Sequence, residues 1–216
     1  MIRTIKIIFN ATIIVLAFIG FNAIGGQKYV EGIKDAVGSF IAQHNADSVK
    51  KIGDFSKMNE EFIIDNTMSI AGFKAVVAEH KASGQKMIIL DSGKKPLLTK
   101  EDIKSQNIDT KLKDLSEKIK YRGIKVQDIQ ISNRGTMEVY GQTVPYAKFN
   151  AHVSKLPVSD ISGVIASVTT SDGSEKLALS VSEKKKYSQL ITTEFYKGVS
   201  ENKQWDSEGK LLWKSF

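Results

Sequence analysis

Near its start the chain carries a long segment without charged residues. The run from residue 7 to residue 26, IIFNATIIVLAFIGFNAIGG, contains no Asp, Glu, Lys or Arg. As an α-helix rising about 1.5 Å per residue it would span about 30 Å, the thickness of the hydrocarbon core of a bilayer. Arg3 and Lys6 precede the run. The positive-inside rule therefore predicts a cytoplasmic N-terminus over residues 1–6, a transmembrane anchor over 7–26, and an extracytoplasmic remainder.

Two alternatives for this segment stay open. A cleaved signal peptide has an apolar core of about 7–15 residues followed by a small-residue cleavage site. Ala23-Ile24-Gly25 is a candidate cleavage site, although the run is long for that class. A buried helix of a soluble protein is the other alternative. Twenty uncharged residues behind a basic N-terminus favour a retained anchor over both.

After the anchor the pattern becomes amphipathic, which predicts a stalk helix over residues 27–57. Apolar and aromatic positions recur at intervals of 3, 4, 3 and 4, the spacing of one helical seam. Asn45-Ala46-Asp47 interrupts the seam, and a second short helical stretch carries Val49, Ile52 and Phe55. The seam could pack on the protein's own body or on a second copy, which leaves a homo-oligomer possible. Its members are Val30, Ile33, Val37, Phe40 and His44.

The body is expected to begin at residue 58 with strands. Residues 60–80 fit both an alternating pattern and a helical spacing. The next residues favour a hairpin, because Lys81-Ala82-Ser83-Gly84 is a turn signal and residues 86–91 form a short apolar run without helical period. The predicted strands cover residues 62–70, 73–80 and 85–91.

A helix is expected next, from a capping arrangement at Thr99 and Asp102 to Lys120. Ile108, Leu112, Leu115 and Ile119 recur at intervals of 4, 3 and 4, and Tyr121-Arg122-Gly123 ends the helix.

From Ile124 to Ser182 the pattern alternates and predicts a four-strand meander. We expect a bulge near Asp128, a turn at Asn133-Arg134-Gly135, and an edge strand or strand start at Pro145. Ser171-Asp172-Gly173-Ser174 is predicted to be a hairpin turn. The last helix is expected from Glu183 onwards, followed by a small hairpin between Trp205 and Trp213.

These elements predict an α+β fold. A single N-terminal transmembrane helix continues into a stalk helix, and a mostly antiparallel sheet, hairpin plus four-strand meander, is packed by two helices. The extracytoplasmic domain is expected over residues 58–200, with a C-terminal hairpin or tail over 201–216.

The chain offers few residues suited to catalysis. It contains no cysteine, which excludes disulfides, thiolate zinc sites and cysteine nucleophiles. Its three histidines lie on separate predicted elements without metal-ligand spacing, so that only a spatial site of His80, His152 and a carboxylate is conceivable. No nucleotide-binding glycine motif and no nucleophile elbow occur. We therefore expect that the protein is not an enzyme and that it has no catalytic residues, metal or cofactor. A hydrolase using Ser and Lys remains a less favoured alternative.

The net charge of the predicted extracytoplasmic part indicates which classes of partner to expect. Leaving out Arg3 and Lys6, 29 basic and 24 acidic side chains remain. Lysines cluster at residues 50–51, 94–95 and 184–186, but arginine is nearly absent and the anchor places this surface outside the cytoplasm. Nucleic acid is therefore not an expected partner. The lysines favour solubility, and they suit anionic lipid head groups or an anionic envelope polymer.

The sequence thus predicts a membrane-anchored extracytoplasmic binding or assembly module of the bacterial cell envelope, with a membrane lipid environment around residues 7–26. Its partner would be an envelope protein or an anionic envelope component. A small-ligand sensor or binding domain is the alternative. The candidate binding surface is the polar face of one predicted strand, Tyr146, Lys148, Asn150 and His152.

Overall fold

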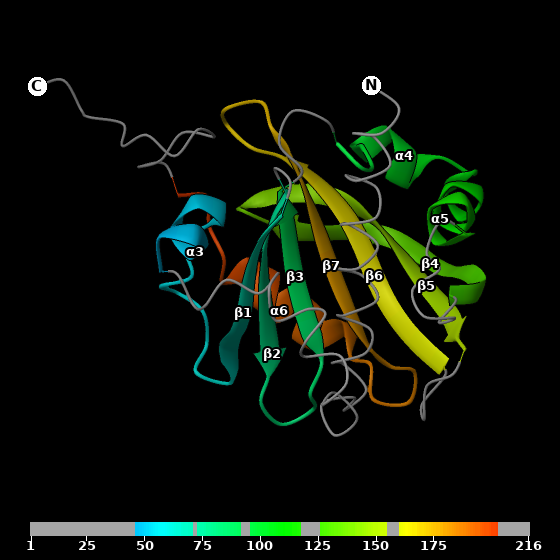
Figure 1. Cartoon of the computed structure of the whole chain (residues 1–216), viewed down its shortest axis with the longest axis horizontal. Coiled ribbons are helices and arrows are strands. Elements are labelled where there is room, and N and C mark those ends of the chain that lie inside the picture. Colours follow the sequence, from blue (N-terminus) through cyan, green and yellow to red (C-terminus); the bar gives the residue numbers. More distant parts are fainter. Residues whose placement is uncertain (1–45, 71–72, 92–95, 118–125, 155–159, 203–216) are drawn as a thin grey trace, which may run out of the picture.

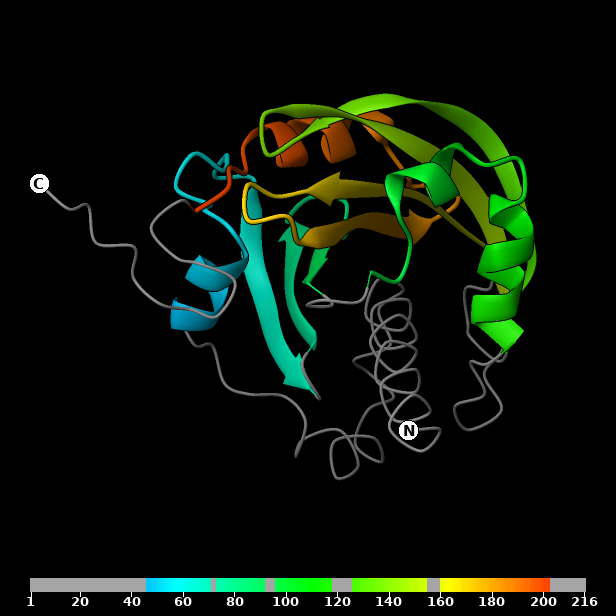
Figure 2. The same cartoon turned by 90° about the horizontal axis from the view of Figure 1, so that it is seen from above.

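The computed structural model describes residues 46–70, 73–91, 96–117, 126–154 and 160–202. They form one seven-stranded antiparallel sheet in the order β1-β2-β3-β7-β6-β5-β4, with helices on both of its faces (Figures 1 and 2). The predicted α+β class is confirmed. The strands are β1 (Phe62–Ile70), β2 (Phe73–His80), β3 (Lys86–Asp91), β4 (Val126–Val139), β5 (Gln142–Val153), β6 (Asp160–Thr169) and β7 (Glu175–Glu183). The helices are α3 (Ala46–Ile52), α4 (Lys100–Lys104), α5 (Ile108–Glu117) and α6 (Gln189–Lys197).

The first three strands confirm the strand interpretation of residues 60–91. β1 pairs with β2 and β2 with β3, both antiparallel, with Phe62 opposite His80 and Ala78 opposite Met87. The turn between β2 and β3 contains Gly84, whose φ of +69° is a conformation that glycine adopts without steric cost. Residues 60–80 therefore follow their alternating apolar pattern and form strands, although they also fit a helical spacing.

The four-strand meander is also confirmed, and β4–β5–β6–β7 are neighbours in that order. The expected bulge near Asp128 is present, because the register shifts between Gln127 and Gln130. The turn expected at Asn133-Arg134-Gly135 is wrong. β4 continues to Val139, and the chain reverses at Tyr140–Gly141, where both residues have positive φ, 53° and 71°. Such a two-residue turn matches the right-handed twist of a hairpin.

Pro145 lies in an inner strand and not in an edge strand. It pairs with Thr136 of β4, whereas the pairing of β5 with β6 begins at the next residue, Tyr146, opposite Ala166. Proline has no N–H to donate, so this place just beyond the β6 ladder suits it.

The helix expected from Thr99 to Lys120 is divided. The capping box of Thr99 and Asp102 is confirmed at the start of α4. α4 ends at Lys104, where Ser105 turns to an extended conformation. The side chain of Arg134 caps this end: Nη1 lies 3.1 Å from Ile103 O and 2.9 Å from Ser105 O. The α5 helix begins at Ile108, three residues after Ser105.

The last helix begins at Gln189 and not at Glu183. β7 continues through Glu183, which pairs with Ile161 of β6. In the turn after β7 the N–H of Lys186 donates to Glu183 O, and Ser188 then caps α6 by accepting from the N–H of Ile191.

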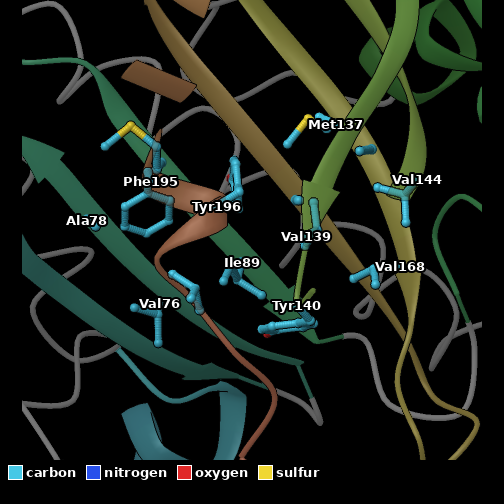
Figure 3. Packing of buried hydrophobic residues seen from close by; sticks show 14 of the residues in the cluster. Val76, Ala78, Ile89, Met137, Val139, Tyr140, Val144, Val168, Phe195 and Tyr196 are labelled. Atoms are coloured by element: carbon cyan, nitrogen blue, oxygen red, sulfur yellow. The ribbon is translucent and has the colours of Figure 1, made fainter. Parts of the chain in front are cut away.

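Each face of the sheet carries a hydrophobic core. On one face, α4 packs on β5 and β6 and α5 packs on β4; Ile103 and Ile108 join this core. On the other face, Phe195 and Tyr196 of α6 pack between β2–β3 and the β4–β5 hairpin (Figure 3). The hydroxyl of Tyr196 reaches the backbone of the sheet centre, 2.7 Å from Leu179 O and 2.9 Å from Ile88 O.

The α3 helix packs on the α6 side of the sheet beside β1, β2 and β3. Ile52 is buried there, and Val49 and Phe55 pack against the same core. Asp54 forms an antiparallel bridge with Ser200. None of the described helices is long and apolar enough to cross a membrane. The predicted anchor, the seam at residues 30–44, the helix end at 121–123 and the hairpin at 205–213 all lie outside the described residues.

Candidate functional site

The four predicted site residues lie on β5 and share the α6 side of the sheet. Alternate residues of a strand point to the same face. Along β6 their opposite neighbours are Ala166, Val164, Ser162 and Asp160, so the surface changes from apolar at Tyr146 to polar at His152. The polar end of this surface, Lys148, Asn150, His152, Asp160 and Ser162, is called the β5–β6 polar face.

Tyr146 belongs to the core more than to this polar face. It packs against the hydrophobic cluster around α6. Its ring also crosses Gly135 of β4, so that a Cβ at Gly135 would lie 2.8 Å from the Tyr146 hydroxyl oxygen. A bulky aromatic residue across from a strand glycine stabilises the pairing at that point. The structure therefore gives Tyr146 a packing role and leaves three of the four residues on the polar face.

Cross-strand pairs organise the polar face. The hydroxyl of Ser162 donates to Asn150 Oδ1 at 2.5 Å. His152 Nδ1 lies 3.1 Å from Asp160 Oδ1; the Asp160 side chain is exposed and that of His152 is partly exposed. Directly opposite pairs of this kind align side chains on antiparallel strands. Ser162 itself is buried, so Asn150, His152 and Asp160 are the members of these pairs that solvent reaches.

Lys148 is held over an aromatic ring. Its Nζ lies 5.0 Å from the centre of the Tyr187 ring, a cation–π geometry. Burial raises the pKa of Tyr187 to about 12, so the ring stays neutral at physiological pH. The neighbouring Lys184, Lys185 and Lys186 are exposed in the turn after β7. The N–H of Lys184 donates to Asp160 O, which places this lysine turn beside the polar face.

The position of Tyr187 depends on a buried polar network that the sequence did not indicate. Gln85 is fully buried and bridges the sheet to the start of α6: its Nε2 donates to Ser180 Oγ, Thr192 Oγ1 and Ser188 O at 2.9–3.0 Å. Its Oε1 accepts from the N–H of Ser188 at 2.8 Å. The hydroxyl of Tyr187 lies 3.0 Å from Thr192 Oγ1.

The two histidines among the described residues, His80 on β2 and His152 on β5, have three strands between them in the sheet order and are not brought together. His80 Nδ1 lies 2.9 Å from Ser83 Oγ, and Nε2 lies 3.6 Å from Glu61 Oε2. The N–H of Ser83 also donates to Nδ1 at 3.2 Å, and Ser83 Oγ accepts from the N–H of Gln85. These bonds close the β2–β3 turn. Among the described residues, no group of three or more His, Asp or Glu side chains is placed to hold a metal ion.

Two buried lysines have structural roles: one forms ion pairs and the other binds the end of a helix. Lys86 of β3 donates to Glu79 of the neighbouring β2 and to Asp65 of β1, one strand further. Lys176 donates to Ile52 O at 3.1 Å, where it meets the C-terminal end of α3. Burial lowers the pKa of Lys176, while the charge of Asp91 acts in the opposite direction.

Comparison with known proteins adds no relative. No family model matches the chain, and a search of curated proteins found no match either. A function for the chain therefore rests on its sequence and on the geometry of the described residues.

Proposed function

We propose that this chain is a membrane-anchored extracytoplasmic binding or assembly module of the bacterial cell envelope. The observation that carries the proposal is the run of twenty uncharged residues at 7–26 behind Arg3 and Lys6, followed by an α+β domain. Such a run is the length that a bilayer requires. The basic residues before it orient the domain away from the cytoplasm.

The β5–β6 polar face is the proposed contact surface. Lys148 lies on this face, the turn with Lys184, Lys185 and Lys186 lies beside it, and Lys186 pairs with Glu183. Asn150 and His152 supply hydrogen-bonding groups. Lysines beside amide and imidazole groups suit an anionic partner, because charge complementarity steers association and hydrogen bonds fix orientation. An anionic envelope component, either a polymer or an acidic surface of an envelope protein, meets these requirements.

The location of the domain is tested first. Because the chain contains no cysteine, a single introduced cysteine can be labelled specifically. Gln106 is exposed between α4 and α5, and Thr4 precedes the apolar run. In intact cells, or in spheroplasts if an outer membrane is present, Gln106→Cys should react with a membrane-impermeant maleimide. Thr4→Cys should react only after the inner membrane is permeabilised. Recovery of the full-length protein in the cytosolic fraction, or reaction of Thr4→Cys alone, would contradict the proposed orientation.

The surface is tested separately in cells making full-length protein. Lys148→Ala, Asn150→Ala and His152→Ala are combined, and envelope partners are captured by crosslinking in the native membrane. The control is Lys104→Ala with Thr110→Ala, which removes an exposed lysine and a hydroxyl from α4 and α5. The triple variant should lose partners that the control retains. Identical partner sets for the two variants would exclude the β5–β6 polar face.

A further inference from the structure

One large apolar side chain of the described body is mostly exposed to solvent. Leu190, in the first turn of α6, is 75% exposed, and Ile63, the other exposed large apolar residue among the described residues, is 41% exposed. The rest of α6 packs on the sheet, with Thr192, Phe195 and Tyr196 buried. A single exposed leucine is common on soluble domains, so its meaning depends on its neighbours.

The neighbours of Leu190 on the surface are lysines. Lys184, Lys185 and Lys186 are exposed in the turn between β7 and α6, which lies at one end of the sheet (Figure 1). Lys186 and Leu190 are four residues apart, so their Cα atoms lie within about 14 Å of each other. Lys186 pairs with Glu183 at 2.9 Å, which leaves Lys184 and Lys185 as the stronger source of positive charge. We call Lys184, Lys185, Lys186 and Leu190 the lysine–leucine turn.

We propose that the lysine–leucine turn rests on the surface of an anionic lipid bilayer. The ammonium groups meet lipid phosphates, and the leucine side chain enters the boundary between head groups and acyl chains. Lysine combined with apolar side chains is typical of segments that lie in this interface. The inference rests on the proposed membrane location, because an anchored domain stays beside a bilayer at all times.

The carboxylates near the turn limit the contact to the N-terminal end of α6. Asp160 lies beside Lys184, and its carboxylate is 3.1 Å from the Nδ1 of His152. The next carboxylate along α6 is Glu194, one helical turn beyond Leu190 and also exposed. A bilayer lying along the whole of α6 would meet Glu194, whereas a bilayer at the first turn meets mainly lysine.

The anchor explains why so small a contact is sufficient. A lysine beside an anionic bilayer strengthens binding by roughly fivefold, so Lys184 and Lys185 together contribute about 25-fold. For a freely diffusing protein such a contact would be weak, because association also removes translational and rotational freedom. In an anchored protein the domain is already held at the bilayer, and the contact only has to fix its orientation.

The length of the chain permits the contact. Lys176, near the start of β7, donates to the carbonyl oxygen of Ile52 at the end of α3, and the lysine–leucine turn follows the other end of β7. With about 27 Å for β7, about 10 Å for α3 and one lysine side chain, Ala46 lies within about 45 Å of the turn. Residues 27–45 separate the predicted anchor from α3, and such a length can extend about 60 Å. The turn can therefore reach the surface from which the anchor emerges.

Fluorescence of the full-length protein tests the contact. The chain has no cysteine, so Leu190→Cys carries a single environment-sensitive fluorophore. The protein is inserted in nanodiscs of phosphatidylcholine alone, or of phosphatidylcholine mixed equally with phosphatidylglycerol. We expect blue-shifted emission, and quenching by a lipid spin-labelled near its head group, only with phosphatidylglycerol. A control fluorophore at Gln106→Cys, exposed between α4 and α5, should show neither effect.

Paired lysine variants test the charge in the Leu190→Cys background. Lys184→Gln with Lys185→Gln should lower the equilibrium constant of the contact by about 25-fold, and quenching should fall to the level in phosphatidylcholine alone. Lys104→Gln with Lys113→Gln removes the same charge from α4 and α5 and should leave the quenching unchanged. All four lysines are exposed, so the two variants should fold equally well.

The possible failures are distinguishable. Inserted protein whose fluorophore is unquenched, or equally quenched in the two lipid mixtures, would contradict the contact and leave the anchor intact. Equal effects of the two lysine pairs would also overturn the inference. Crosslinking of position 190 to an envelope protein in cells, without quenching in nanodiscs, would assign the turn to a protein partner. Protein recovered outside the nanodiscs would contradict the anchor and this inference with it.

Discussion

The hydroxyl of Tyr140 donates a hydrogen bond of 2.6 Å to the carbonyl oxygen of Ile52. This contact joins the tip of the β4–β5 hairpin to the last residue of α3, 88 positions away in the chain. Lys176 Nζ donates to the same carbonyl oxygen. The last carbonyl groups of a helix lack partners within the helix, so two donors from the sheet anchor α3 by its C-terminal end.

Tyr140→Phe should remove this anchor while keeping the ring in the core. We expect a loss of about 1–2 kcal/mol in the free energy of unfolding, the cost of deleting one buried hydrogen bond. Urea unfolding of the detergent-solubilised full-length protein measures it. Hydrogen exchange should rise in α3 and stay constant in β6. Unchanged exchange in α3 would show that the ring alone holds the helix.

Gly163→Ala should destabilise the sheet centre. A Cβ at this position would strike the backbone oxygen of Ser180 and lie 2.6 Å from Cζ of Phe149. The backbone oxygen cannot move without breaking strand pairing, so we expect a loss of about 2–3 kcal/mol. Gly135→Ala is the matched control, because its Cβ would meet only the end of the Tyr146 ring. Thermal unfolding should show a clearly lower midpoint for Gly163→Ala than for Gly135→Ala.

Gln85→Ala should loosen the start of α6. The substitution leaves Ser180, Thr192 and the N–H of Ser188 without the partner that Gln85 gives them. Ser180 and Thr192 keep their mutual hydrogen bond, whereas the N–H of Ser188 loses its partner. A buried polar group left without a partner costs about 1–3 kcal/mol, and we expect a loss of that size. Hydrogen exchange of residues 189–192 reports the local effect. Exposed Gln106→Ala is the control, and similar stabilities for both variants would contradict the role given to Gln85.

Stability should fall steeply above about pH 10. Burial raises the pKa of Tyr140 and Tyr196 above the usual 10.0 and that of Tyr187 to about 12. The unfolded chain therefore releases protons that the folded chain keeps, and each tyrosine costs about 1.4 kcal/mol per pH unit in this window. Lys176, whose pKa is lowered, acts in the opposite sense but only up to pH 10.5.

Urea unfolding between about pH 9 and pH 11 tests this dependence, with tyrosinate absorbance as a second probe. Tyr187→Phe should reduce the slope by the contribution of one proton. A stability that stays level across this range, with tyrosinate appearing in the folded protein, would show that the three hydroxyl groups are accessible.

Much of the sheet could be predicted from local pattern. The strands of residues 62–91, the bulge at Asp128 and the capping box at Thr99 each depend on neighbouring residues, and the structure confirms them. Where the prediction was wrong, a residue distant in the sequence lies at the place concerned. Gly135 lies within β4 under the ring of Tyr146, and the end of α4 is capped by Arg134, 30 residues further along the chain.

The candidate site was predictable to a smaller extent. Strand alternation placed Lys148, Asn150 and His152 on one face, but the same alternation could not show that Tyr146 packs in the core. The partners Asp160, Ser162 and Tyr187 depend on strand register and on where α6 begins. Neither is fixed by the residues immediately around β5.

The pairing of Asp54 with Ser200 brings the entry and exit of the described body to one corner. The N–H of each residue donates to the carbonyl oxygen of the other, at 2.8 and 3.0 Å. A pulling force applied between the two chain ends would load these two bonds first and leave the seven-stranded sheet relaxed. A fusion joined directly after Asn202 would start beside α3, because Asn202 Nδ2 donates to Lys50 O.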